Sequence, residues 1–92
     1  MTRSVFNPVA ARADFPILHR TVNGKPLNYL DAAATSQKPR VVLDAERRYY
    51  ETANAAVNRG AHTLAGEATD LFEDARARVA GYLGAGEREL VW

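Results

Sequence analysis

Cysteine is absent from the 92-residue chain, and lysine is nearly absent, with Lys25 and Lys38 the only two. The lack of cysteine excludes disulfides, thiolate metal sites and a cysteine nucleophile within these residues. Neither lysine lies in a pattern that predicts the desolvated pocket a Schiff-base lysine needs, because one follows a turn and the other precedes a proline. Covalent chemistry by thiol or amine is therefore not expected from this chain alone.

No charge of one sign dominates either, since 12 Lys and Arg residues are interleaved with 11 Asp and Glu residues, for a net charge of +1. A nucleic-acid footprint is therefore weak. The opening stretch, Met1 to Ala11, has no apolar core of signal-peptide length, and no segment approaches the roughly 20 apolar residues of a membrane span. We expect a cytoplasmic protein with no membrane or nucleic-acid partner.

What is present is the ordinary apolar content of a globular sequence, 47% of residues. A chain this short forms one small domain at most, and a domain of this size buries only about 60–65% of its unfolded surface. We predict marginal stability and expect the chain to fold against something else.

Turn and helix-cap residues divide the chain into short elements. Asn7-Pro8 predicts a helix start and Phe15-Pro16 its stop. Asn23-Gly24, between His19–Val22 and Pro26–Asp31, predicts a β-hairpin because Asn-Gly supplies the positive φ values of a tight turn.

Two longer helices follow the hairpin. The first begins at Pro39 and ends near Asn54, with apolar or aromatic positions at Val42, Ala45, Tyr49 and Ala53. The second begins near Thr63, a candidate cap, and ends at Gly84. We expect its buried stripe to comprise Ala68, Leu71, Phe72, Ala75, Val79 and Tyr82.

The last residues, Leu90–Trp92, form an apolar run after turn residues and predict the first strand of a sheet. A strand needs partners for its backbone groups, and the sequence offers only the earlier hairpin. We therefore expect a truncated chain.

The stretch from Val57 to Thr63 carries the candidate site residues, Arg59 and His62, in a loop between two helices. Loops held by helices are common places for sites. The simpler interpretation, which we favour on these residues alone, is that His62 or Thr63 caps the following helix and that Arg59 pairs with an acid. No metal-ligand spacing or triad occurs nearby.

Several stretches, in order and spacing, resemble the opening of the group II (SUF-type) cysteine desulfurases, which belong to the class V aminotransferases. They are Arg12–Leu18, Val22–Leu27, Tyr29–Pro39, Asn54–Leu64 and Ala68-Thr69. The match covers nearly the whole chain and is highly specific in combination. Residues 1–92 would then be the N-terminal segment of a cysteine desulfurase domain, with an α/β architecture from the type I pyridoxal-phosphate fold.

The resemblance implies a cytoplasmic homodimer that takes sulfur from L-cysteine, gives L-alanine and passes a persulfide to a sulfur-acceptor protein for iron–sulfur cluster assembly. It places Ala33 and Ala34 near the substrate, and Asn58, Arg59 and His62 near the active site or dimer interface. Many relatives have histidine where this chain has Asn58, so an acid–base role does not transfer to that position.

The family's phosphate-binding turn, Schiff-base lysine and nucleophilic cysteine come after the part of the domain that this chain resembles. We therefore predict that the chain alone binds no pyridoxal phosphate and is an inactive fragment. The alternative is a short interaction protein that pairs with a full-length desulfurase or its sulfur acceptor. A small helical DNA-binding protein is disfavoured, because the Ala55–His62 loop is too long and acids begin the helix that would bind phosphate.

Overall fold

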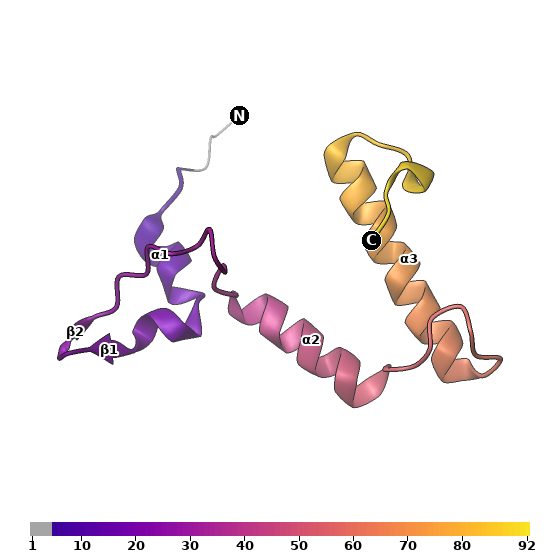
Figure 1. The fold of residues 1–92 in the computed structure, drawn as a ribbon, viewed down its shortest axis with the longest axis horizontal. Coiled ribbons are helices and arrows are strands. Elements are labelled where there is room, and N and C mark those ends of the chain that lie inside the picture. The colour runs from indigo at the N-terminus through magenta and orange to yellow at the C-terminus, as the bar shows by residue number, and fades with distance from the viewer. Residues whose placement is uncertain (1–4) are drawn as a thin grey trace. The chain divides into compact units, whose positions relative to one another are not determined.

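The computed structural model describes residues 5–92. In chain order its elements are helix α1 (Pro8–Ala13), 3₁₀ helix η1 (Pro16–His19), strands β1 (Thr21–Val22) and β2 (Lys25–Pro26), helices α2 (Arg40–Thr52) and α3 (Thr63–Leu83), and 3₁₀ helix η2 (Glu87–Glu89) (Figure 1). The chain divides into two compact units, Met1–Arg47 and Arg48–Trp92. Helices and a small antiparallel sheet confirm the α/β class in its coarse form.

Helix α1 begins where the sequence predicts and ends at Ala13, just before the predicted stop at Phe15-Pro16. Asn7 is extended, and its Oδ1 accepts hydrogen bonds from the backbone N–H groups of Val9 at 3.0 Å and Ala10 at 3.2 Å. Pro8 occupies the first turn, where its missing N–H has no partner to lose. Because a six-residue helix has little stability of its own, this cap largely decides whether it forms.

Replacing Asn7 with alanine removes both of these hydrogen bonds. We expect the N7A variant to lose about 1 kcal/mol of α1 stability, as is usual for a lost N-cap. Far-UV circular dichroism and amide exchange at Val9 and Ala10 would measure the loss. The matched control is N7D, which keeps the accepting oxygen, and equal exchange in N7A and the parent would contradict the cap assignment.

The predicted hairpin turn is confirmed, but its strands are shorter than expected. Asn23 and Gly24 both have positive φ, 53° and 73°. The turn that they form places Thr21 opposite Pro26 and Val22 opposite Lys25 in the antiparallel pair. His19 lies in η1, and the residues after Pro26 form no strand. Pro26 has no N–H to donate, so the two-stranded ladder ends at that residue.

A half-buried arginine connects three segments of the first unit by hydrogen bonds. The Arg12 guanidinium donates to the carbonyl oxygen of Leu18 at 3.1 Å and also to that of Leu27. It therefore joins α1 both to the end of η1 and to the chain that leaves β2. The Arg40 N–H, at the start of α2, donates to the Asp14 carbonyl at 2.8 Å.

Helix α2 begins one residue after Pro39, whose carbonyl accepts from the N–H groups of Val42 at 3.0 Å and Leu43 at 3.2 Å. The predicted helix is thus confirmed, with its end at Thr52. Its apolar side chains are largely exposed, as for Val41 at 73%.

Helix α3 ends at Gly84 as predicted, with φ of 71°. Its cap is His62 rather than Thr63, since His62 Nδ1 accepts from the Ala65 N–H at 3.2 Å.

The predicted buried stripe of α3 is wrong for most of its large side chains. Leu71 is 50% exposed and Tyr82 is 91% exposed, whereas Ala65, Ala68 and Ala80 are buried. Periodicity identifies the face that can be buried, but burial needs a second surface. Within residues 48–92 the packing between segments buries only alanine side chains.

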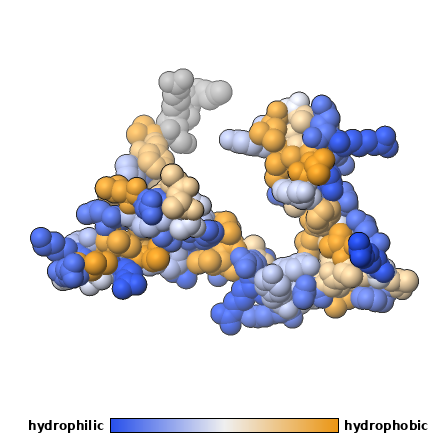
Figure 2. All heavy atoms as spheres, viewed as in Figure 1, coloured by the Kyte–Doolittle hydropathy of each residue, from blue (hydrophilic) through white to orange (hydrophobic). Residues whose placement is uncertain are grey.

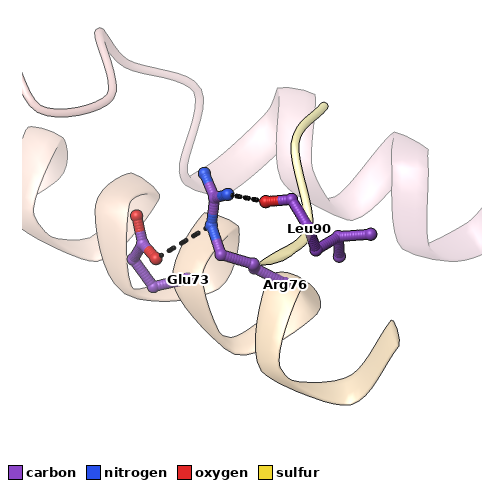
Figure 3. Close-up of polar contacts among 3 residues, drawn as sticks. All are labelled: Glu73, Arg76 and Leu90. Carbon is purple, nitrogen blue, oxygen red and sulfur yellow. Dashed lines mark hydrogen bonds and ion pairs between the residues drawn. The ribbon is translucent and has the colours of Figure 1, made fainter. Parts of the chain in front are cut away.

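The predicted strand at Leu90–Trp92 is not formed in the described residues. Leu90 has extended φ and ψ but no strand partner, because η2 turns the chain back toward α3. Trp92 packs edge-on against Phe72, with ring centroids 6.1 Å apart. The Arg76 guanidinium contacts Glu73 at 3.3 Å and donates to the Leu90 carbonyl (Figure 3). It also lies 5.3 Å from the Phe72 ring centroid.

Each unit carries many apolar side chains on its surface, seen as orange atoms in Figure 2. Among residues 5–92 the buried hydrophobic residues are four alanines, at positions 53, 65, 68 and 80. Exposed large residues include Leu30 at 94% and Trp92 at 60%. None of the described helices is long and apolar enough to cross a membrane.

Candidate functional site

The alanine turn of the first unit is fixed by hydrogen bonds to a neighbouring tyrosine. The Asp31 carbonyl accepts from the N–H groups of Ala34 at 3.1 Å and Thr35 at 3.4 Å. The Tyr29 hydroxyl lies 3.1 Å from the Asp31 carbonyl and 2.7 Å from that of Thr35, so its single proton is shared between the two ends of the turn. Ala33 and Ala34 are exposed, and their short side chains leave the backbone open to close approach by a ligand.

The loop before α3 contains a left-handed residue. Asn58 has φ of 60°, a conformation that asparagine tolerates better than most side chains. Its backbone N–H donates to the Thr69 hydroxyl at 3.0 Å, and that hydroxyl donates to the Ala65 carbonyl at 2.8 Å. One helical side chain therefore holds the turn against α3.

Gly60 and His62 bring the same loop into close contact with α3. A Cβ built on Gly60 would lie 2.5 Å from the Ala65 Cβ and 2.9 Å from His62 Nε2, both below contact distance. Glycine is thus required by close approach, not by backbone conformation. His62 accepts from the Ala65 N–H through Nδ1, which confirms the capping interpretation.

Arg59 extends from this fixed loop into solvent. Its backbone N–H makes a long, 3.5 Å hydrogen bond to the Ala56 carbonyl, and the residue is exposed. The expected ion pair with an acid is not formed within residues 5–92, where the Arg59 side chain makes no hydrogen bond or ion pair. The loop therefore presents a guanidinium that remains available to an anionic group.

Neither lysine has the environment that pyridoxal phosphate requires. Lys25 is exposed on β2, and the Lys38 ammonium, also exposed, donates to the Ser36 carbonyl at 2.8 Å. A Schiff-base lysine needs desolvation or a cationic neighbour to lower its pKa. The residues present do not fit the cofactor. In the part of the chain that the structure describes, no three His, Asp or Glu side chains gather into a metal-binding group.

A shallow cavity of about 290 Å³ lies in the second unit and was not predicted from the sequence. Two acids and two arginines line it, namely Glu73, Arg76, Glu87 and Arg88. Arg76 is already engaged with Glu73 and the Leu90 carbonyl, so this cavity belongs to the contact that holds η2 and the chain end against α3.

The predicted site residues therefore form two groups. Asn58, Arg59 and His62 lie together on one loop of the second unit, whereas Ala33 and Ala34 lie on a turn of the first unit. Sequence reasoning gave no role to Tyr29 or Thr69, whose hydroxyls fix these two segments. The available signal for Thr69 was a threonine inside a helix, where the hydroxyl commonly bonds the carbonyl four residues earlier.

The sequence from Asn28 onward matches a known family. The model of the class V aminotransferases covers residues 28–92, which is most of the chain and includes both candidate segments. The chain therefore belongs to the class V aminotransferase family.

Particular relatives narrow the similarity further. A probable cysteine desulfurase of Vibrio cholerae is 49% identical over 96% of this chain, and a cysteine desulfurase of Klebsiella pneumoniae is 51% identical over 94%. A probable cysteine desulfurase of Synechocystis is 55% identical over 88%. The matched region spans only 22%, 21% and 20% of these relatives, so the chain has about a fifth of their length.

Proposed function

We propose that this chain is the N-terminal segment of a SUF-type cysteine desulfurase, whose complete form takes sulfur from L-cysteine, gives L-alanine and holds the sulfur as a persulfide for iron–sulfur cluster assembly. The observation that carries the proposal is the identity of about 50% to cysteine desulfurases over nearly the entire chain. The complete form would be a cytoplasmic homodimer with the type I pyridoxal-phosphate fold.

The surface of the chain supports its being a segment of a larger domain. A soluble monomer rarely leaves so many large apolar side chains exposed, and here Leu30, Tyr82 and Trp92 are all more exposed than buried. Only alanines are buried in the described residues, which is far less apolar area than a stable domain removes from water. The rest of a longer chain would cover these surfaces.

In that setting the two segments would supply binding surface, not the reacting groups. The alanine turn at Ala33 and Ala34 allows close approach to the backbone, and the loop at Asn58, Arg59 and His62 offers the exposed Arg59 guanidinium on a hydrogen-bonded backbone. The pyridoxal phosphate would be held by residues outside this chain, because its two lysines are exposed and unsuited.

The test is an assay of the protein expressed from the complete gene. We expect that protein to convert L-cysteine to L-alanine, with one sulfur transferred for each alanine formed. Amino-acid analysis would measure the alanine, and sulfide detection would measure the sulfur after added dithiothreitol has reduced the persulfide to sulfide. L-Serine is the matched control, since it carries a hydroxyl where cysteine carries the sulfur. If the complete gene encodes no more than this chain, or if its product leaves cysteine unchanged, the proposal is wrong and the short interaction protein becomes the better interpretation.

A further inference from the structure

The Thr69 hydroxyl makes two hydrogen bonds that connect separate parts of the second unit. It accepts from the Asn58 N–H at 3.0 Å and donates to the Ala65 carbonyl at 2.8 Å. The side chain is half-buried, so its donor and acceptor capacity are both used inside the protein. Thr69 lies in the second turn of α3, eleven residues after Asn58 in the sequence.

The hydrogen bond from Asn58 constrains an unfavourable backbone conformation. A left-handed φ of 60° costs energy for residues other than glycine, and it persists only where neighbouring groups hold it. Asn58 is exposed, so packing around its side chain does not hold the turn. The bond to Thr69 and the close approach of Gly60 to Ala65 do.

We propose that Thr69 is a positioning residue, whose hydroxyl fixes the left-handed turn at Asn58 and thereby sets the direction in which Arg59 leaves the loop. This inference rests on the proposed function, because it assigns the turn to the desulfurase site. Asparagine at position 58 then serves the backbone conformation, and its side chain need not transfer protons. Loss of the hydroxyl leaves the chain folded but frees the turn.

The experiment compares T69V with T69S in the protein expressed from the complete gene. Valine keeps the β-branched shape and removes the hydroxyl, whereas serine keeps the hydroxyl. We expect amide exchange at Asn58 to rise about tenfold in T69V, as for loss of one protecting hydrogen bond, and to stay near the parental rate in T69S. Exchange in the last turns of α3 should be unchanged in both variants, which separates a freed turn from an unfolded helix.

Turnover of L-cysteine supplies the second readout. We expect kcat/KM to fall about tenfold in T69V and to stay near the parental value in T69S. The reason is that a small displacement of a site residue, here Arg59, has an effect of this size or larger. Unchanged exchange at Asn58 in T69V would overturn the positioning role. Raised exchange at Asn58 with unchanged turnover would show that the turn lies outside the active site, and this result would also overturn the positioning role of Thr69.

The two proposals fail in different ways. A parental protein that does not convert L-cysteine overturns the proposed function, and with it the assignment of the turn to a desulfurase site. Exchange at Asn58 is measured without substrate, so it decides independently whether Thr69 holds the turn.

Discussion

The 92-residue chain, purified by itself, is expected to release no alanine or sulfur from L-cysteine and to remain colourless after incubation with pyridoxal phosphate. The physical reason is that it contains no cysteine to carry sulfur and that both lysines are exposed, with the Lys38 ammonium donating to the nearby Ser36 carbonyl. Neither lysine has the desolvated pocket or the cationic neighbour that activates a Schiff-base lysine. The expected effect is complete loss of turnover relative to the complete gene product.

The measurement is a side-by-side assay of the two proteins at equal molar concentration, with visible absorbance as the readout of lysine-bound cofactor. A variant of the short chain with both lysines replaced by arginine is the matched control for adventitious reaction with the aldehyde. Stoichiometric absorbance that this variant abolishes, together with alanine release by the short chain, would contradict the expectation.

Alanine substitution at two nearby glycines is expected to change the stability of the second unit in opposite directions. At Gly60 the new Cβ would lie 2.5 Å from the Ala65 Cβ, so the G60A variant must displace the loop from α3. We expect a destabilisation of about 1–3 kcal/mol, the usual range for overpacking. At Gly66, inside α3, a Cβ meets nothing within 4 Å, and G66A should stabilise the helix by about 0.5–1 kcal/mol.

Urea titrations of the protein expressed from the complete gene, followed by far-UV circular dichroism, would measure both changes. The pair is matched because each variant adds one methyl group at a glycine within six residues of the other. If G60A leaves the unfolding midpoint unchanged or raises it, the close approach of Gly60 to α3 is not present in solution.

The local elements could be predicted because short-range chemistry decides them. Asn7 with Pro8 defined the start of α1, Asn23-Gly24 defined the hairpin turn, and Gly84 defined the end of α3. Each of these signals acts within a few residues through a cap, a fixed φ or a permitted positive φ. The family resemblance also came from the sequence, and the match over residues 28–92 confirms it at the level of the class V aminotransferases.

The errors concern what each element packs against. The stripe on α3 is apolar as predicted, but most of its large side chains are exposed where burial was expected. Leu90–Trp92 was predicted as a strand and has no strand partner in the described residues. Periodicity reports which face is able to be buried, whereas burial depends on residues distant in the chain. Arg59 likewise has no acidic partner among residues 5–92, because an ion pair depends on where other side chains lie.

The sequence by itself determined the family, the order of the helices and hairpin, and the loop that carries Asn58, Arg59 and His62. The sequence also offered His62 as a cap of α3, but only the tertiary structure decided that Gly60 is needed for close approach and that Thr69 holds the turn at Asn58. The physical reason is the range of the forces involved. Caps and turns depend on neighbours in the chain, whereas a hydroxyl eleven residues away becomes a partner only after the loop and α3 have packed together.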